Sequence, residues 1–254
     1  MTDTLSNASR RNTLGMIGAS LLWPCIGRAE ATEHVSGRAF GTTWQVTGPT
    51  GGGLENLRAK IEALFASVDL QMSPWRHDSA ISRFNAAQAG WQPMQDELRY
   101  VAQSALTLAS QSAGVFDPTI GPLVARWGFG PITDGAPGWS GLAVDGAGMT
   151  KHEDGLTLDL CGIAKGWALD RATDLMRSHG HENLLFDLGG ELVALGKHPS
   201  GRSWRVAVEH PVMEAEASAV LRLDPGQAVA TSGLRTQSYG FSGHQYGHII
   251  DPLR

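Results

Sequence analysis

Residues 158–170, LDLCGIAKGWALD, place an acid, a turn of small residues and a lysine close together. Asp159 lies in an apolar, strand-like run, Cys161–Ala164 make the turn, and Lys165 opens a helix-like segment. A carboxylate and a cation beside a backbone with little side-chain bulk suit a site that approaches a phosphate or a metal ion. A tight junction between a strand and a helix would use the same residues, so this stretch alone leaves both interpretations open.

Two further stretches combine polar or aromatic groups with a restricted backbone. Phe116–Pro122 holds Asp117, which suits either a ligand contact or a rigid loop in which Asp117 caps the next segment. Trp127–Pro131 carries two aromatic rings on a glycine-rich backbone, which suits either a hydrophobic plug or the face of a planar ligand. Neither stretch by itself separates a structural role from a binding role.

Further acids and a histidine come later in the chain. Asp187–Glu191 has two glycines between acids, which favours a hairpin turn or a bulge. His248 precedes Ile249 and Ile250 in the sequence HIIDP. Histidine changes its charge near neutral pH, so His248 is a candidate general base, although a lone histidine is more often structural.

Several common motifs of catalysis and nucleotide binding do not occur. The opening stretch lacks the glycines and the Lys-Ser/Thr pair of a P-loop, and the sequence has no HExxH or CxxC. A GxGxxG after a strand is absent, which leaves a Rossmann dinucleotide site unsupported. The GxSxG of a nucleophile elbow is absent as well.

The composition is that of a globular protein with enough apolar residues for a core. The 254 residues are 42% hydrophobic and 18% charged, and the formal net charge is -5. A negative balance of this kind does not favour a nucleic-acid surface, so we expect no nucleic-acid partner.

Residues 1–31 have the pattern of an export signal. Arg10 and Arg11 precede an apolar stretch that is too short to span a bilayer comfortably, and Ala29–Ala31 offers a cleavage site of small residues. Paired arginines are typical of a twin-arginine signal, which predicts a periplasmic protein; an anchor that is never cut is the alternative. After cleavage Cys161 would be the one remaining cysteine, so we expect no internal disulfide.

Hydrophobic periodicity predicts the helices and strands that must position these residues. Helices are expected from Leu54 onward, over Asp96–Ala113 and over Ile163–His179, with Gly114 and Gly180 ending the last two. Residues 72–87 are expected to be a loop and residues 128–150 a surface excursion with little regular structure. Strands are expected at 37–47, 156–160, 183–187, 191–195, 203–209, 218–223, 228–231 and 244–250. Helices early and strands late favour an α+β fold.

Taken together, seven stretches resemble the ApbE family of periplasmic flavin transferases. They are GRAFGTTW, MSPWRHDSAISRFN, GVFDPTIGPLVARWGFGP, LDLCGIAKGWALD, FDLGGELVALGKHPSGRSWRVAVEHP, AVATSG and GHIIDP. Their order and approximate spacing match from about residue 35 to the end. The resemblance implies one α+β domain over residues 32–254, with a mixed or antiparallel sheet core and flanking helices.

The activity that the resemblance implies is that of an FAD:protein FMN transferase. In such an enzyme FAD is the substrate, and Mg²⁺ lies at its pyrophosphate. A threonine or serine hydroxyl of a target flavoprotein attacks the FMN-side phosphorus, and AMP leaves. The expected partner is an acceptor flavoprotein of an exported or membrane respiratory complex.

The resemblance also assigns site residues, motif by motif. Contacts to FAD fall on Phe40, Trp75, Val115, Phe116, Asp117, Asp159, Lys165 and Ile250. Phe40 stands where the family often has methionine and Trp75 where it often has tyrosine. The backbone carbonyl of Gly162 matches a Mg²⁺ ligand, and His248 matches the histidine that activates the acceptor hydroxyl.

The chain ends at Arg254, shortly after the HIIDP motif. Family members continue beyond this motif with an Asp and a Thr, four positions apart, that complete the magnesium site. We therefore expect a domain that is incomplete at its C-terminus, either as a fragment, as a naturally shortened protein, or with ligands supplied by another chain. The alternative function is an FAD-binding or FAD-hydrolysing protein without transferase activity.

Overall fold

A computed structural model of the chain describes residues 32–208, 218–234 and 237–253. The expected export signal, residues 1–31, lies outside these described residues. The helices are η1 (Leu54–Leu57), α1 (Arg58–Met72), α2 (Ala80–Ala86), α3 (Asp96–Gln111), α4 (Gly121–Arg126), η2 (Trp139–Gly141) and α5 (Ala164–Ser178). With the strands given below, they confirm the expected α+β fold.

The largest sheet has five antiparallel strands in the order β1-β2-β6-β7-β10. These strands are β1 (Thr32–Ala39), β2 (Thr42–Pro49), β6 (Leu184–Leu188), β7 (Glu191–Leu195) and β10 (Ala228–Ala230). Smaller antiparallel sheets are formed by β3 (Gly90–Pro93), β5 (Gly148–Lys151) and β4 (Leu142–Asp145), by β8 (Trp204–Val208) and β9 (Ala219–Leu223), and by β11 (Ser238–Phe241) and β12 (His244–Gly247). A mixed or antiparallel sheet core was expected, and in the described residues all strand pairs are antiparallel.

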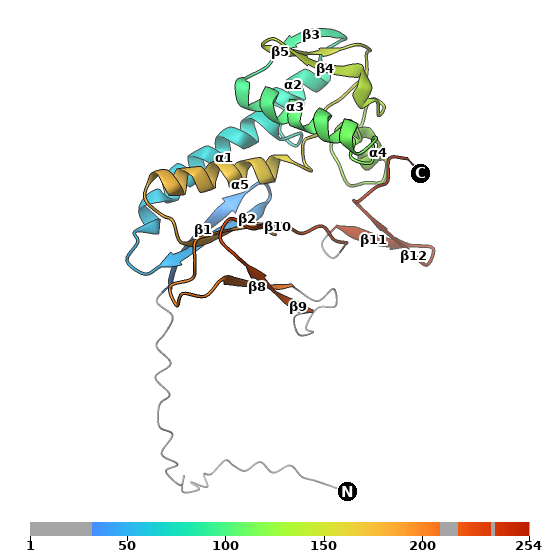
Figure 1. The fold of residues 1–254 in the computed structure, drawn as a ribbon. Coiled ribbons are helices and arrows are strands. Elements are labelled where there is room, and N and C mark those ends of the chain that lie inside the picture. The colour runs from blue at the N-terminus through green and yellow to red at the C-terminus, as the bar shows by residue number, and fades with distance from the viewer. Residues whose placement is uncertain (1–31, 209–217, 235–236, 254) are drawn as a thin grey trace, which may run out of the picture. The chain divides into compact units, whose positions relative to one another are not determined.

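The helices α1 and α5 pack against each other and against the large sheet, as Figure 1 shows. Aromatic rings fill the space between helix and sheet: Trp44 of β2 and Phe186 of β6 each lie about 6 Å from the ring of Phe65 on α1. All three rings are almost completely buried. Edge-to-face contacts of this kind add to the free energy that burial of the rings already supplies.

The expected single strand over residues 37–47 is wrong, because the chain turns back within it. Phe40 and Gly41 both have positive φ angles, 50° and 73°, and join β1 to β2 in a hairpin. Such an angle suits Gly41 but is uncommon for a phenylalanine. The turn holds Phe40 against the core, with its ring 5.5 Å from the ring of Phe65.

The three expected helices are present. The helix expected from Leu54 begins as η1 and continues as α1, with Ile61, Phe65 and Val68 buried. Gly114 ends the α3 segment at φ 84°, and its N–H donates to the carbonyl of Ala109, as a C-terminal glycine does. On α3, Leu98, Val101 and Ala105 are buried, whereas Leu108 is exposed.

Two regions expected to be irregular contain regular elements. The expected loop at residues 72–87 includes α2, whose first turn is capped by the Ser79 hydroxyl accepting from the Ser82 N–H at 3.1 Å. The expected excursion at 128–150 contains η2, β4 and most of β5. Elements as short as these are stabilised by capping residues and by packing on other elements. The periodicity of hydrophobic residues in the sequence does not predict either contribution.

Residues 156–160 form neither a helix nor a strand in the described structure, so the strand expected there is wrong. Leu156, Leu158 and Leu160 are buried in the core, and Thr157 between them is buried as well. Instead of a neighbouring strand, the side-chain amide of Asn85 pairs with the backbone of Leu158, accepting from its N–H at 2.7 Å and donating to its carbonyl at 2.9 Å.

The later strands agree with the sequence apart from their ends. The Asp187–Glu191 stretch is the β6–β7 hairpin turn, with Gly189 and Gly190 at positive φ. The strand expected at 244–250 stops at Gly247, and its partner β11 was not expected. Among the described residues, none of the helices has the length and apolar character needed to cross a membrane.

Glu33 on β1 gives a testable consequence of this fold. Its carboxylate accepts from the N–H groups of Leu54 and Gly51 at 3.1 and 3.0 Å, and these backbone hydrogen bonds lower the pKa of Glu33 below its ordinary value of 4.5. A carboxyl with a lowered folded-state pKa stabilises the protein above its unfolded-state pKa, and this contribution is lost as the pH falls through the folded-state pKa. Glu33→Gln should therefore lower the Tm at neutral pH, with the difference from the wild type vanishing in acid.

Thermal unfolding across this pH range checks the prediction. Glu153→Gln, in an exposed bend, is the matched control and should leave the Tm unchanged. A difference between Glu33→Gln and the wild type that stays constant from neutral to acid pH would contradict the role of the carboxylate.

Candidate functional site

Segments that are distant in the sequence meet around the end of α3. A Cβ placed on Gly162 would lie 3.2 Å from the ring of Phe116, so the 159–163 turn packs directly on residues 115–117. A Cβ placed on Gly114 would lie 3.9 Å from the side chain of Leu253, so the last described residues reach the same place. The segments of Phe116 and Gly162, which carry predicted FAD and Mg²⁺ contacts, are therefore in direct contact, and the segment of Ile250 approaches them through Leu253.

Asp159 is fixed by its own backbone and by the turn that follows. Its N–H donates to the carbonyl of Pro118 at 2.7 Å, and its carboxylate accepts from the N–H of Cys161 at 2.9 Å. A Cβ on Gly121, in the first turn of α4, would be 3.4 Å from the Asp159 Cβ. Desolvation and the neighbouring Asp159 carboxylate raise the pKa of the Cys161 thiol well above its ordinary value.

Asp117 stabilises the loop before α4 but does not cap that helix as expected, because the N-cap of α4 is Ile120 and no side chain bonds to its first turn. Its carboxylate accepts from the N–H of Thr119 at 2.8 Å and from the Thr119 hydroxyl at 2.6 Å. The same hydroxyl accepts from the N–H of Gly138 at 2.7 Å, and Thr119 is fully buried. Asp117 thus holds Thr119 in the turn before α4 through one oxygen of its carboxylate. The Thr119 hydroxyl in turn connects this turn to Gly138.

The helix α5 begins directly after the turn at Gly162. Its N-cap residue Ile163 provides no side-chain hydrogen bond to the first turn, so the turn's N–H groups lack the usual capping oxygen. The start of a helix of this length carries partial positive charge and can bind an anion such as a phosphate. Lys165 lies in this first turn and adds a full positive charge.

Lys165 is paired with Glu191 at the start of β7. The ammonium lies 2.8 Å from the carboxylate, and both side chains are largely shielded, at 33% and 16% exposed. Thr231 joins this corner because its N–H donates to the carbonyl of Gly190 at 3.1 Å. The pair connects the start of α5 to the end of the large sheet. The sequence did not single out Glu191 as the partner of Lys165.

The same end of the sheet carries the β1–β2 turn. A hollow of about 380 Å³ is lined there by Arg38–Thr43, which include Phe40. A Cβ on Gly189 would lie within 2.5 Å of the Thr42 side chain, so the β1–β2 and β6–β7 turns are packed together. Phe40 and Lys165 therefore belong to elements that share this end of the sheet.

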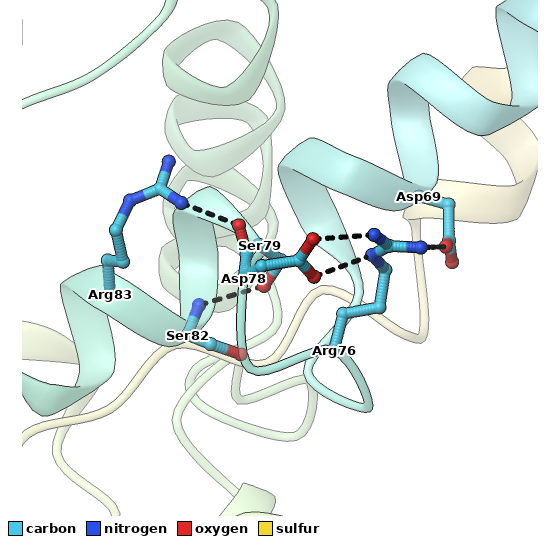
Figure 2. A network of polar contacts seen from close by, with 6 residues as sticks. All are labelled: Asp69, Arg76, Asp78, Ser79, Ser82 and Arg83. Atoms are coloured by element: carbon cyan, nitrogen blue, oxygen red, sulfur yellow. Dashed lines mark hydrogen bonds and ion pairs between the residues drawn. The ribbon is translucent and has the colours of Figure 1, made fainter.

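Trp75 lies on the loop between α1 and α2, and its side chain is 64% exposed. The next residue, Arg76, makes two hydrogen bonds to Asp78, at 3.0 and 2.7 Å, and a third to Asp69 of α1 at 3.4 Å. Figure 2 shows the guanidinium of Arg76 held between these two acids. The loop is thus anchored, which gives an exposed aromatic ring a defined position.

His248 follows β12 and is partly buried. Its Nδ1 lies 3.2 Å from the carbonyl oxygen of Gln237, and its ring meets the ring of Phe129 edge-on at 6.3 Å. If Nδ1 carries the proton and donates to this carbonyl, Nε2 is left with a lone pair that can accept a proton. Ile250 is partly buried two residues later, whereas Val115 is 62% exposed.

Stacked aromatic rings join the Trp127–Pro131 stretch to the β11–β12 hairpin. Trp127 stacks on Tyr246 at 5.3 Å and Phe129 on Tyr239 at 5.4 Å, while the two tyrosines stack on each other at 5.5 Å. Trp127 and Phe129 thus stack on the hairpin at the protein surface, where Trp127 and Tyr239 are 42% and 41% exposed. Tyr239 and Tyr246 were not expected from the sequence, where no hydrophobic period marks them.

The described residues do not make a complete magnesium site by themselves. Within the described ranges, no group of three or more His, Cys, Asp and Glu side chains is placed to hold a metal ion. Gly162 is exposed, which leaves room for an ion to approach its backbone. One carbonyl is a poor site for Mg²⁺, which prefers six oxygen ligands.

Comparison with known proteins places this arrangement in a family. Residues 40–254 match the profile of the ApbE family. The chain is similar to the FAD:protein FMN transferase of Vibrio cholerae serotype O1, with 33% identity over 262 residues that cover 95% of this chain and 78% of the relative.

Solved structures agree with the sequence comparison. The flavin transferase ApbE from Vibrio cholerae is similar with a TM-score of 0.77 and 32% identity, covering 87% of this chain and 76% of its own. The apo form of the Pseudomonas stutzeri flavinyl transferase ApbE gives a TM-score of 0.76 and 34% identity, covering 87% of this chain and 74% of its own.

The pair of Lys165 and Glu191 gives a prediction about the stability of the site. Lys165→Met should lower the free energy of unfolding by about 1–2 kcal/mol, because a shielded carboxylate loses its partner, and Lys165→Met/Glu191→Gln should recover part of the loss. Urea unfolding measures both. Arg222→Met breaks a more exposed pair with Asp224 and should cost less than about 0.5 kcal/mol. Equal losses for Lys165→Met and Arg222→Met would contradict a stabilising role of the pair.

Proposed function

The chain belongs to the ApbE family, and on this premise we propose that it transfers FMN from FAD to a threonine or serine hydroxyl of a target flavoprotein, with release of AMP. The observation that carries the proposal is the packing of Gly162, in the turn before α5, on the ring of Phe116. A flavin dinucleotide has two phosphates and two ring systems. The helix start and Lys165 suit the phosphates.

The ring systems of FAD have candidate partners on elements around this point. Phe40 and Trp75 present aromatic surface from two anchored turns, and Phe116 does so from the loop before α4. Aromatic side chains suit planar ligands because flat faces bury much area at a small cost in conformational entropy. Val115, Asp117, Asp159 and Ile250 are proposed to complete the contacts to FAD.

His248 is proposed to accept the proton of the acceptor hydroxyl. With Nδ1 donating to Gln237, Nε2 takes the hydroxyl proton as the oxygen bonds to the FMN-side phosphorus. The bond from this phosphorus to the AMP oxygen breaks, and AMP departs with the electron pair of that bond. FMN is then attached to the acceptor through a phosphoester.

Mg²⁺ is proposed at the pyrophosphate, with the carbonyl of Gly162 as one ligand. When bound, the ion neutralises charge on the phosphates, which is the general contribution of Mg²⁺ to phosphoryl chemistry. Since one carbonyl cannot hold it, its other oxygen ligands must include groups besides those described here, such as FAD phosphates and water.

The role of His248 can be separated from FAD binding. His248→Ala should lower FMN transfer by about 100-fold or more, because the hydroxyl loses its base, while the Kd for FAD changes less than about threefold. Transfer is measured as covalent flavin fluorescence on an acceptor peptide that carries threonine, and the Kd by titration of FAD. His244 is an exposed histidine on β12, just before His248. His244→Ala is therefore the matched control and should retain transfer.

Two outcomes would change the proposal. Equal loss of transfer and of FAD binding in His248→Ala would remove the histidine from its assigned role. AMP release by the wild-type protein without an acceptor, together with no labelling of any acceptor, would favour hydrolysis of FAD to FMN and AMP instead.

We also propose that the protein is exported to the periplasm by its twin-arginine-like signal and that its acceptor belongs to an exported or membrane respiratory complex. The support is the sequence pattern of residues 1–31. Arg10→Lys/Arg11→Lys should leave the uncut precursor in the cytoplasm, which fractionation and immunoblotting would detect. Arg28→Lys lies outside the pair and should be exported. Normal export of the double variant would contradict the proposed signal.

A further inference from the structure

We propose that Asn85 is a positioning residue that places Asp159 and the Gly162 turn for binding of the flavin dinucleotide. This inference rests on the proposed function, because it concerns the same site. Asn85 lies at the end of α2, 73 residues from its partner Leu158 in the sequence. The resemblance to the family assigned no role to it.

The segment before the turn has an unusual need for hydrogen-bond partners. Leu156, Thr157, Leu158 and Leu160 are buried, yet the described structure does not place residues 156–160 in a helix or a sheet. Buried backbone N–H and carbonyl groups lose free energy if they are left unpaired. The side chain of Asn85 meets this need at Leu158, since its carbonyl accepts from the N–H and its amide NH₂ donates to the C=O.

This pairing imitates one step of a strand ladder. An asparagine amide has the same donor and acceptor as a peptide group, so one side chain can replace one residue of a neighbouring strand. The following residue is Asp159, whose N–H is taken by the carbonyl of Pro118. This segment is therefore held by α2 through Leu158 and by the loop before α4 through Asp159.

Asn85 is itself held rigidly. The ammonium of Lys151, on β5, donates to the carbonyls of Asn85 and Ala87 at 3.1 and 2.8 Å, and it lies over the ring of Phe84 at 4.8 Å. Lys151 is 1% exposed. This buried ammonium fixes the backbone at the end of α2, from which the Asn85 side chain reaches the backbone of Leu158.

The consequence for the site follows from the short path between these residues. Asp159 is adjacent to Leu158, its carboxylate accepts from Cys161, and Gly162 packs on Phe116. If the two hydrogen bonds at Leu158 are lost, the turn and the start of α5 are no longer held in a fixed position relative to α2. A site that binds phosphates through backbone groups depends on such positioning.

The test compares Asn85→Ala with Asn183→Ala. Asn183 also accepts from a backbone N–H through its side chain, that of Lys197 at 2.8 Å, but at the end of the β6–β7 hairpin opposite to its Asp187–Glu191 turn. Asn85→Ala should weaken FAD binding about tenfold. Asn183→Ala should leave FAD binding within about twofold of the wild type, even where its Tm falls by as much. Equal effects of the two variants on FAD binding at equal loss of Tm would overturn the proposal.

A second variant gives a signature that general destabilisation does not produce. In Asn85→Asp an ionised carboxylate faces the carbonyl of Leu158 and cannot donate to it, whereas a protonated carboxyl can donate to that carbonyl and accept from the N–H. FAD binding by Asn85→Asp should therefore be weaker than that of Asn85→Ala near pH 8 and should recover toward the wild type as the pH falls below about 4, the ordinary pKa of an aspartic acid. The charged groups nearby are Lys151, Asp154, which interacts with Lys151, and Asp159.

The wild type and Asn85→Ala, titrated with FAD over the same pH range, correct for effects of these other groups. No recovery of Asn85→Asp in acid, relative to these two proteins, would overturn the pairing with Leu158. If Asn85→Ala fails to fold, this comparison with the wild type still decides the question.

Amide exchange separates this proposal from the proposed function. Asn85→Ala, which removes both bonds, should accelerate exchange of the Leu158 and Cys161 N–H groups, with no FAD present, by about tenfold or more. If the wild type binds no FAD but this acceleration is seen, the proposed function fails while the positioning by Asn85 stands. If exchange at Leu158 is unchanged in Asn85→Ala, the positioning fails whatever the protein binds.

Discussion

The structure around the candidate site depends on one constraint, which is that a buried backbone must have its hydrogen bonds satisfied. Residues 156–160 enter the core without joining a sheet in the described structure, and side chain and loop groups satisfy them instead. Residues 156–160 lead directly into the Gly162 turn and α5. The geometry of the site is therefore set by groups on α2 and on the loop before α4.

The start of α5 connects two parts of the candidate site, the loop at Phe116 and the end of the large sheet at Glu191. On one side the turn packs on Phe116, and on the other side Lys165 is paired with Glu191 at the end of the large sheet. A helix that is fixed at both of these points can present its first N–H groups in a constant direction. Preorganisation of this kind favours binding of an anion, because little conformational entropy remains to be lost.

Much of the fold could be predicted from the sequence because it follows local rules. Gly114 and the Asp187–Glu191 stretch have the turn roles expected from their glycines. The hairpin at Phe40 could not be predicted, since a phenylalanine at positive φ is held by tertiary packing on Phe65. The strand predicted at 156–160 is absent, although its leucines are buried, because the side chain of Asn85 and not a neighbouring strand bonds to Leu158. Alternation of leucines reports which face is buried and says nothing about what supplies the hydrogen bonds. The predicted ligand contacts of the site residues stay predictions.

The Cys161 thiol has a consequence for the chemical behaviour of the turn. A pKa held well above the ordinary range keeps the sulfur protonated at neutral pH, and a protonated thiol is a poor nucleophile. Alkylating reagents and oxidised glutathione should then react slowly at this position, although the residue is exposed. The sulfur there acts as a small side chain of low reactivity, because desolvation and, after it, the Asp159 carboxylate disfavour the thiolate.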